Sequence, residues 1–342
     1  MAVGIVSAAF FSDTVTMLGD KKGNNMPENR QLAISAFGGP ETLHIIDSER
    51  PVPGPDQVLV KVAYAGVNPI DAKTRAGIGW AAEQNKDKLP WVPGYDVAGE
   101  VVGSGSHQEI FENGDRVAGL VGFPLQGGCY SEYLAIDAAA LSSVPTGVDF
   151  ELAAALPVCG QTAWQAMEKA GVTADEKVLV LAGAGGVGHI AVQLAKQRGA
   201  DVFASCSAAN TAFLTDLGTT VIDYQCNELA QYQAFFDVII DLIGGETGID
   251  ALSALKGQGR MITVPTVTKD AVMAEASQRG LKAEGMLVDP NRWQMDRLLA
   301  MVETGELDIE ISNIYPLEKG GEAHQSIMSG RIRGKLLLKV AK

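Results

Sequence analysis

The chain has few residues suited to holding a metal ion or forming a redox pair. It contains four cysteines and four histidines among 342 residues. No two cysteines form a C-x-x-C pair of the kind found in zinc knuckles and redox dithiols, and the histidines are scattered without ligand spacing. We therefore expect reduced thiols, a cytoplasmic location and no metal site. The residues concerned are Cys129, Cys159, Cys206, Cys226, His44, His107, His189 and His324.

Long apolar runs and an excess of basic charge are also absent. No run reaches the ~18–20 apolar residues needed to cross a bilayer, and no basic residue precedes the apolar stretch 2–11 to mark a secretory signal. The chain carries 41 acidic and 27 basic residues, a net charge of −14, which repels nucleic-acid phosphates and anionic lipid. We expect neither nucleic acid nor membrane as a partner.

Length and composition favour an enzyme-like scaffold of two domains. The chain exceeds the ~100–200 residues typical of one domain. Its 46% hydrophobic content supports a substantial core, and its 39 glycines predict many tight turns. The first 30 residues show little periodicity and include a polar cluster at 21–29, so we expect a leader, possibly disordered, whose first 25 residues are dispensable for folding.

Two different patterns of predicted secondary structure follow one another along the chain. Short strand-like runs at 31–36, 57–65, 97–102 and 115–121 predict a β-rich domain over residues 31–150. The run 149–171 predicts a helix that ends at Gly171, and beyond it strands such as 201–206 alternate with helices. This pattern predicts a doubly wound parallel sheet over residues 151–307 and an α/β fold class. We assign the closing strand, near 335–340, to the first domain, so that residues 308–342 complete it.

A glycine-rich loop is the strongest chemical signal. Residues 183–188 read GAGGVG, which fits G-x-G-x-x-G directly after a predicted strand and at the start of a helix. Gly183 permits the tight turn, Gly185 lets the backbone reach a pyrophosphate, and Gly188 lets the helix pack on the strand. Helix-start N–H groups at Gly186 and Val187 face the anion. The alternative is an ordinary glycine-rich turn.

The choice between NADPH and NADH depends on the strand that ends near residue 206. NAD enzymes usually place an acidic residue there to bind the ribose 2′-hydroxyl, but the chain reads SCSAAN at 205–210. No acid repels a 2′-phosphate, and four side chains can donate hydrogen bonds to it, although no Arg or Lys is present. These four are Ser205, Ser207, Asn210 and Tyr224. We expect NADPH, with strand-end packing as the alternative for Tyr224.

The run Asp175-Glu176-x-x-Leu179 and the glycine loop that precedes Gln193 and Lys196 resemble the signature of quinone oxidoreductases and ζ-crystallins. Further resemblance lies at 65–71, 93–99, 114–117 and 333–335. It implies the medium-chain dehydrogenase/reductase superfamily, in which a GroES-like catalytic domain faces a Rossmann domain across the active-site cleft. It also implies a homodimer formed through the edge of the Rossmann sheet, here residues 285–288.

Zinc-dependent members of that superfamily have Cys where this chain has Asn68 and His where it has Tyr95. Neither replacement is a good zinc ligand. Cys159 lies near the third ligand position, and without partners we expect it to pack as a small apolar group. The segment 100–115 contains no cysteine for a structural zinc lobe. We therefore expect a zinc-free enzyme.

Without a Lewis acid, an acceptor that is already electron-poor is easier to reduce than an alkoxide is to stabilise. By resemblance, Asn68 lies beside the nicotinamide and donates to the acceptor oxygen, with a turn before Pro69 as the alternative. Lys73 stands where many relatives have Tyr, and either donates to substrate or cofactor or pairs with Asp71. Tyr95 is a further candidate donor, with a role in buried aromatic packing as its alternative.

Other positions are expected to contact the cofactor. Thr162 matches a position that approaches the nicotinamide carboxamide or the phosphates, with a helix-interior role as its alternative. The loops after two strands lie at carboxyl ends, where open α/β sheets bind ligands, and Lys335 reaches the cofactor from the C-terminal strand. The loop residues are Ile243, Gly244, Val264 and Pro265.

These features predict an NADPH-dependent, metal-independent oxidoreductase that transfers hydride to a quinone or another conjugated carbonyl. Two alternatives remain open: an enoyl or 2-alkenal reductase, and a non-catalytic NADPH-binding sensor or structural protein in the manner of ζ-crystallin.

Overall fold

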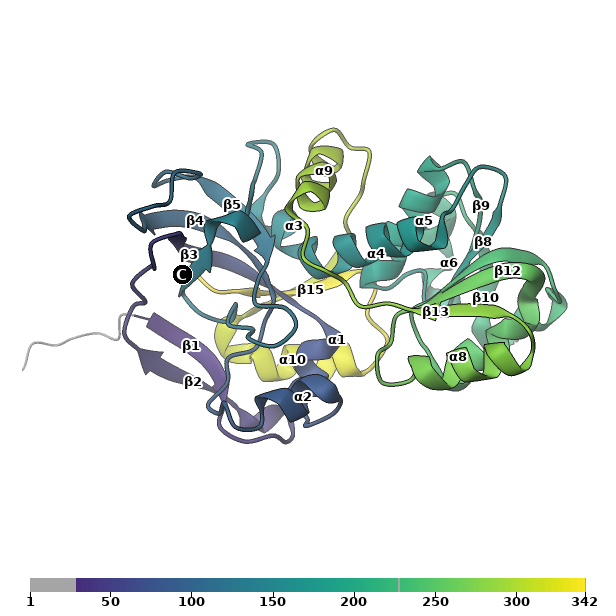
Figure 1. Ribbon diagram of the computed structural model, residues 1–342, viewed down its shortest axis with the longest axis horizontal. Helices are drawn as coiled ribbons and strands as arrows, with labels where there is room; N and C mark the ends of the chain where they lie inside the picture. The colour runs from purple at the N-terminus through teal and green to yellow at the C-terminus, as the bar shows by residue number, and fades with distance from the viewer. Residues whose placement is uncertain (1–28, 227, 342) are drawn as a thin grey trace, which may run out of the picture.

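The computed structural model describes residues 29–226 and 228–341; the expected leader falls almost entirely outside this part of the chain. The described residues form two large sheets side by side, one made mainly by the N-terminal part of the chain and the other by its middle, and a third sheet of two strands (Figure 1). None of the described helices is both long and apolar enough to span a membrane.

The first sheet is mostly antiparallel and has the strand order β14-β15-β3-β4-β5-β7, with β6 also pairing β3. A separate hairpin joins β1 to β2. The strands are β1 (Asn29–Ile34), β2 (Leu43–Ser48), β3 (Gln57–Val67), β4 (Asp96–Ser104), β5 (Arg116–Leu120), β6 (Tyr133–Asp137), β7 (Ser142–Ser143), β14 (Ile311–Pro316) and β15 (Lys335–Lys339).

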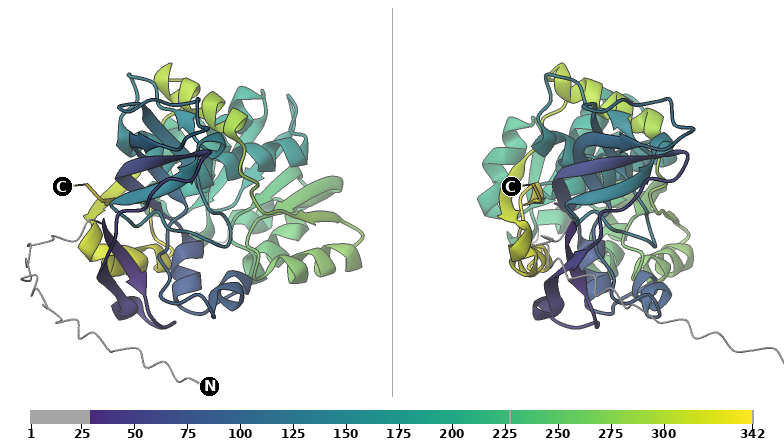
Figure 2. Two further views of the ribbon diagram at one scale, coloured as in Figure 1. Left: turned by 60° about the vertical axis from the view of Figure 1, so that its left-hand side comes forward. Right: turned by 90° about the vertical axis from the view of Figure 1, so that its left-hand side faces the viewer.

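The end of the chain returns to this sheet, as the sequence predicts. β15 pairs with β3 in antiparallel register, with Leu337 opposite Gly66. In Figure 2 the yellow C-terminal segment lies against the blue and purple N-terminal part. Burial along β3 shows which face of this sheet packs on the core. Val58, Val60 and Val62 are buried while Lys61 is exposed, as in a strand that has one face on a core.

The second sheet is entirely parallel, in the order β10-β9-β8-β11-β12-β13, which confirms the predicted doubly wound sheet. Along β8, Val178 and Val180 join one core cluster, whereas Leu179 and Leu181 join another on the opposite face. The strands are β8 (Lys177–Val180), β9 (Asp201–Cys206), β10 (Thr220–Asp223), β11 (Phe236–Asp241), β12 (Leu255–Thr263) and β13 (Lys282–Gly285).

Helices cover both faces of the parallel sheet. Residues of α4, α5 and α9 lie in the first of these clusters, and residues of α7 and α8 lie in the second. Strand order reverses beside β8, which lies between β9 and β11, so the loop after β8 opens at the switch point where such sheets bind ligands. The helices are α3 (Phe150–Ala155), α4 (Pro157–Ala170), α5 (Gly186–Gln197), α6 (Thr211–Asp216), α7 (Gly245–Ala251), α8 (Lys269–Gln278), α9 (Arg292–Glu303) and α10 (Gly320–Met328).

The structure differs from the sequence-based expectation in two places that matter for the site. The part expected to be mainly β contains α1 (Pro69–Arg75) and α2 (Trp80–Asn85). The expected single helix from 149 to 171 is two helices, because Pro157 lacks an N–H and begins α4. The predicted end at Gly171 is confirmed, since that residue has φ 60° in the left-handed region that glycine favours.

Candidate functional site

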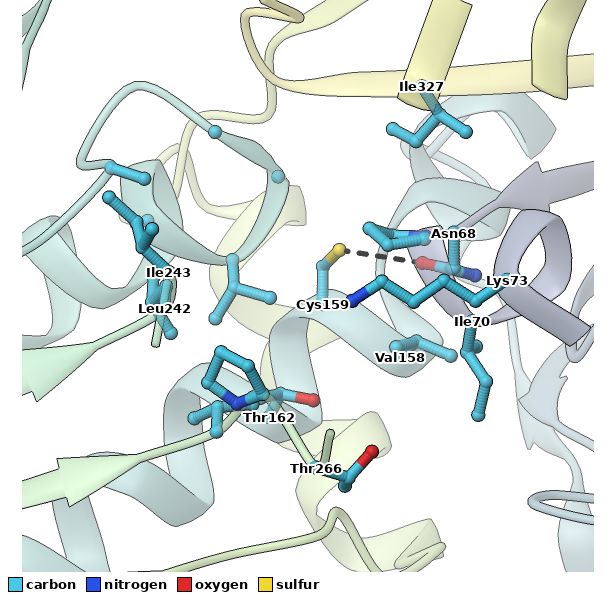
Figure 3. Close-up of a pocket in the computed structure, with 18 of the residues that line it drawn as sticks. Asn68, Ile70, Lys73, Val158, Cys159, Thr162, Leu242, Ile243, Thr266 and Ile327 are labelled. Carbon is cyan, nitrogen blue, oxygen red and sulfur yellow. Dashed lines mark hydrogen bonds between the residues drawn. The ribbon is translucent and has the colours of Figure 1, made fainter. Parts of the chain in front are cut away.

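A cavity of about 520 Å³ lies between the two sheets. One wall is the glycine loop after β8 with the loops after β11 and β12. The other wall comes from the end of β3, helices α1 and α2, and the loop around Phe123. Figure 3 shows Leu242 and Ile243 on one side of this cavity and Asn68, Ile70 and Lys73 on the other.

The glycine loop has the geometry of an anion cradle. Gly185 is the residue before α5, and the first N–H groups of a helix, here from Gly186 onward, have no carbonyl partner within it. Gly185, Gly186, Val187 and Gly188 line the cavity, whereas Gly183 lies behind it. A Cβ on Gly183 would be 2.6 Å from the Ala204 Cβ, so that glycine serves close packing.

Ser205 supports the loop from the neighbouring strand. Its hydroxyl oxygen accepts the N–H of Ala182 at 3.1 Å, and its carbonyl accepts the N–H of Gly183 at 2.9 Å. Ser205 is buried and lines the cavity. The sequence-based interpretation proposed a contact to the cofactor ribose; the structure adds this bracing of the phosphate loop.

Of the other residues expected beside the cofactor ribose, one lines the cavity and two do not. Tyr224 lines the cavity and is 59% exposed, while Ser207 and Asn210 are not among its lining residues. The sequence reasoning missed Asp223, which pairs with Cys206 in the register of β10 and β9. Its Oδ1 accepts the N–H of Gln225 at 2.9 Å. The signal was present, since the motif TVID places an acid at a strand end.

The loops after β11 and β12 form the rest of that wall. Ile243, Val264 and Pro265 line the cavity, together with Leu242 and Thr266. Gly244 does not line it. Gly244 has φ 71° and directly precedes α7, so its role in the structure is the turn between Ile243 and that helix.

Asn68 occupies the opposite wall at the start of α1. Its main-chain N–H donates to Asp71 Oδ2 at 2.8 Å, which fixes the first turn. Its side-chain Oδ1 accepts from Lys335 Nζ at 2.8 Å, and its Nδ2 donates to Asp96 Oδ2 at 2.8 Å. Asn68 is therefore more than a turn residue before Pro69, because both ends of its amide have a charged partner.

Lys335 lines the cavity, yet its ammonium is turned to protein partners. Its Nζ lies 2.9 Å from Asp96 Oδ2 as well as beside Asn68, and its side chain is 2% exposed. Burial is the largest influence and lowers the pKa of Lys335, but the charge and hydrogen bond of Asp96, together with the charges of Cys159 and Asp71, outweigh it and the pKa is raised. The expected contact of Lys335 with the cofactor stays a prediction, and in this structure the ammonium is bound by Asp96 and Asn68.

Lys73 is a donor that faces the cavity. In Figure 3 its side chain extends from α1 toward the middle of the cavity. No hydrogen bond or ion pair to the Lys73 ammonium occurs among the described residues. The alternative of a pair with Asp71 is not seen, because that carboxylate accepts the N–H groups of Asn68 and Gly94.

Tyr95, the third expected donor, lies outside the cavity lining. Its hydroxyl donates to the Pro124 carbonyl at 3.0 Å, and its ring packs edge-on against Phe123 at 5.2 Å. Burial raises the pKa of Tyr95. The structure therefore places this side chain in the packing role that was its alternative.

Thr162 and Cys159 come from α4 and line the cavity. Burial raises the pKa of the Cys159 thiol, and its Sγ lies 3.8 Å from Asn68 Oδ1. Among the described residues no three His, Cys, Asp or Glu side chains gather in a group that holds a metal. A zinc ion does not fit here, because the thiol adjoins an ammonium and an engaged amide.

Two family models match the chain. An alcohol dehydrogenase GroES-like domain matches residues 54–146, and a zinc-binding dehydrogenase domain matches residues 217–338. The first agrees with the β-rich part that carries Asn68 and the second with the part that ends in β15. Despite its description, the second match does not supply the missing zinc ligands.

Known proteins of similar sequence and structure span nearly the whole chain. The structure of the quinone oxidoreductase from Coxiella burnetii is 39% identical, covers 92% of this chain and 99% of its own, and superposes with a TM-score of 0.89. The quinone oxidoreductase of Homo sapiens is 31% identical over 90% of this chain and 97% of its own. An NADPH-dependent alkenal/one oxidoreductase of Arabidopsis thaliana is 30% identical over 91% and 79%.

These matches confirm the resemblance drawn from the glycine loop and its flanking motifs, and they confirm a GroES-like domain joined to a Rossmann-type parallel sheet. The chain belongs to the medium-chain dehydrogenase/reductase superfamily, in its quinone oxidoreductase family, and is an NAD(P)H-dependent oxidoreductase by type.

Proposed function

We propose that the protein transfers hydride from NADPH to a quinone or another conjugated carbonyl compound without a metal ion. One observation carries this proposal: a single cavity has a glycine loop at a helix start on one wall and the Lys73 ammonium, beside Asn68, on the other (Figure 3). The first suits a dinucleotide and the second suits an oxygen on which negative charge develops.

Bound NADPH supplies a hydride, and its main-chain partners would be the N–H groups at Gly186, Val187 and Gly188. The Lys73 ammonium would donate to the acceptor oxygen while the conjugated system takes up two electrons. Asn68 lies beside it, with its amide oxygen toward Cys159 (Figure 3) and its Nδ2 donating to Asp96. A proton then reaches the acceptor oxygen from solvent through Lys73, which is partly exposed.

The remainder of the acceptor side is apolar. Ile70, Ile78, Trp80, Phe123 and Val288 line it, so a flat hydrocarbon ring or an alkyl chain would bury apolar area there. A quinone satisfies both requirements, since it presents a carbonyl oxygen on an apolar ring. A 2-alkenal or enoyl substrate does so as well, which keeps that class as the second candidate.

The choice of NADPH rests on hydrogen bonds near the ribose. Ser205 and Tyr224 line the cavity, and Ser207 and Asn210 follow β9 directly. Asp223 is the opposing feature, because its carboxylate lies next to Cys206 and would repel a 2′-phosphate. We retain NADPH and use Asp223 as a test below.

Oxidation of NADPH, followed by its absorbance with a panel of acceptors, tests the proposal. Turnover with 1,4-quinones is expected; faster turnover with 2-alkenals would assign the second candidate class. Tight NADPH binding without turnover on any acceptor would instead identify a sensor or structural protein.

Replacing Lys73, and separately an exposed lysine, tests whether an effect on kcat comes from the cavity and not from the loss of a surface charge. K73M should lower kcat about 10- to 100-fold, since one donor to the developing oxyanion is lost. The matched control is K88M, because Lys88 is exposed and does not line the cavity. Equal kcat in wild type and K73M would remove Lys73 from the proposed mechanism.

Assembly and location are part of the same proposal. β13 is the edge strand of the parallel sheet, and Leu287 beyond it is 41% exposed, so a homodimer would form through residues 285–288. Light scattering would show a mass of twice 35.9 kDa. The cytoplasm remains our predicted location, and fractionation of the source cells would check it.

A further inference from the structure

The cavity between the two sheets is lined without acidic side chains, although the chain as a whole is strongly acidic. The 41 Asp and Glu residues outnumber the 27 Lys and Arg residues, yet none of the described residues that line the cavity is an Asp or a Glu. The lining does include two lysines, Lys73 and Lys335. The cavity is therefore basic inside an acidic protein, which favours an anionic ligand.

Of these two ammonium groups, one is paired and the other is not. Lys335 Nζ lies 2.9 Å from Asp96 Oδ2, and its side chain is 2% exposed, so the protein itself compensates its charge. The Lys73 ammonium has no hydrogen bond or ion pair in the part of the chain that the structure describes. In Figure 3 the side chain of Lys73 points toward the middle of the cavity. The unmatched positive charge of the cavity is thus that of Lys73.

Asp71 balances this charge only in part, although it lies on the same helix as Lys73. Its carboxylate does not line the cavity, and it accepts the main-chain N–H groups of Asn68 and Gly94. Burial raises the pKa of Asp71 to about 7, so its carboxyl group carries only part of a negative charge at neutral pH. A negative group bound in the cavity would meet a net positive charge.

The acceptor is better placed than the cofactor phosphates to supply that negative group. The pyrophosphate is expected at the start of α5, whereas Lys73 extends from the wall opposite Leu242 and Ile243 (Figure 3). The surroundings of Lys73 on the acceptor side are apolar and include Ile70 and Phe123. A carboxylate is costly to bury among such side chains unless a cation pairs with it, and Lys73 is the cation at hand.

The same ammonium has to serve two oxygens, which constrains the shape of the acceptor. Lys73 donates to the carbonyl oxygen on which charge develops, so a carboxylate can share it only if the two groups are neighbours. In a 2-oxo-3-enoate the carboxylate is bonded to the carbonyl carbon, and the three N–H donors of one ammonium can reach both oxygens. In a 4-oxo-2-enoate the carboxylate lies at the far end of the double bond, out of reach of that ammonium.

We propose that the preferred acceptor is an anionic conjugated carbonyl compound, a 2-oxo-3-enoate, whose carboxylate and carbonyl oxygens are bound together by Lys73. The inference rests on the proposed function and deepens it by naming the substrate class. Hydride from NADPH adds to C4 of the acceptor, and the electron pair of the C3–C4 double bond moves to the carbonyl oxygen. A proton from solvent then adds to C3 and restores the carbonyl, which leaves NADP+ and the saturated 2-oxo acid.

Three matched acceptors test this proposal when oxidation of NADPH is followed: (E)-2-oxo-4-phenylbut-3-enoate, its methyl ester, and its isomer (E)-4-oxo-4-phenylbut-2-enoate. The ester removes the charge, and the isomer keeps the charge but moves it away from the carbonyl. The 2-oxo acid should exceed both in kcat/KM by about 10- to 100-fold, the size of one charge-assisted hydrogen bond. The ester is the more electrophilic compound, so intrinsic reactivity cannot produce this preference. Equal kcat/KM for acid and ester would overturn the inference.

The variant K73Q assigns the preference to a charge, because an amide side chain still donates a hydrogen bond but is neutral. The acid-to-ester ratio of kcat/KM should fall at least about tenfold in K73Q. It should stay unchanged in K88M, since Lys88 is exposed and does not line the cavity. A ratio that survives in K73Q would overturn the role of Lys73. So would a large rise in the NADPH dissociation constant of K73Q with the ratio unchanged, because that result identifies a partner of a cofactor phosphate.

Binding of the product gives a measurement that does not depend on turnover. The pair 2-oxo-4-phenylbutanoate and 4-phenylbutan-2-one differs by a carboxylate in place of a methyl group, and intrinsic fluorescence can report both, since Trp80 lines the cavity. The acid should bind at least about tenfold more tightly in wild type, and K73Q should remove the difference. If quinones and the ester are reduced while the acid has no advantage, this inference alone fails. If no acceptor is reduced, the proposed function fails.

Discussion

Gly188 lies so close to Ala182 that a Cβ on this glycine would be 2.2 Å from the Ala182 carbonyl oxygen. A Cβ on Gly185 would meet the same oxygen at 3.3 Å and nothing nearer. The two glycines of one motif therefore serve different purposes. Gly188 allows α5 to approach the strand, whereas Gly185 leaves open space on the cavity side.

This difference predicts different outcomes for two substitutions. G185V should keep the fold and weaken NADPH binding at least tenfold, because the added side chain occupies the approach of the pyrophosphate. G188A should lower the free energy of unfolding by about 1–3 kcal/mol, since backbone must shift to admit the methyl group. Thermal melts and fluorescence titration with NADPH measure the two effects. Unchanged NADPH affinity in G185V would count against this loop as the cofactor site.

Asp223 predicts a change in cofactor preference. Asp223 stands opposite Cys206, the last residue of β9, near where a 2′-phosphate would be bound. D223N removes a negative charge and should tighten NADPH about 3- to 10-fold relative to NADH, since two unit charges about 4 Å apart interact by about 1 kcal/mol when water screens them. Dissociation constants for both cofactors test this, with the exposed Asp201 at the start of the same sheet as the control D201N. An unchanged ratio of the NADPH and NADH dissociation constants in D223N would mean that the cofactor ribose does not bind beside Asp223.

His324 predicts how stability depends on pH. It is fully buried, its Nε2 lies 3.2 Å from the Tyr130 hydroxyl, and Arg75 is the nearby charge. Burial, followed by Arg75, lowers the pKa of His324 to about 3. The unfolded chain binds a proton here near pH 6.5 and the folded chain does not, so this contribution to stability is present above pH 6.5 and lost as pH falls.

H324Q lacks that titration. Between pH 7 and pH 4 the wild type should therefore lose more free energy of unfolding than H324Q, by up to about 3 kcal/mol. Asp71 titrates in both proteins, so its contribution cancels when their free energies of unfolding are compared. Urea unfolding at several pH values gives the comparison, and parallel curves for the two proteins would show that His324 is protonated in the fold.

The sequence predicted the parts of this structure that follow from local rules. β9 was expected at 201–206 and is found there, and the glycine loop follows its strand because turn, strand and helix signals coincide. Helices α1 and α2 were not predicted, since both are short and lie between strand-like runs. Short helices depend on tertiary packing more than on their own sequence.

The site was predictable only where its residues adjoin a motif. Asn68 and Lys335 are 267 positions apart, and nothing in their spacing indicates a hydrogen bond. Lys335 was predicted from the sequence only to reach the cofactor from the C-terminal strand. Its partner is decided by the buried carboxylate of Asp96, since a buried ammonium requires a compensating charge.

The apolar end of the cavity predicts a dependence on the chain length of the acceptor. Ile78 lines the cavity and is 44% exposed, which places it at the mouth, where a substituent on a quinone ring would leave the site. Each buried methylene contributes about 0.8 kcal/mol, so kcat/KM should rise about fourfold per carbon along a short 2-alkyl-1,4-benzoquinone series.

I78S should flatten that rise while leaving the unsubstituted quinone nearly unaffected, because the short acceptor does not reach residue 78. I314S is the matched control: Ile314 is 39% exposed on β14 and does not line the cavity. A slope that is equal in wild type, I78S and I314S would mean that the chain leaves the cavity by another path. A slope lost in I78S alone would assign the mouth between α1 and α2 to the hydrocarbon part of the acceptor, leaving Lys73 to its oxygen.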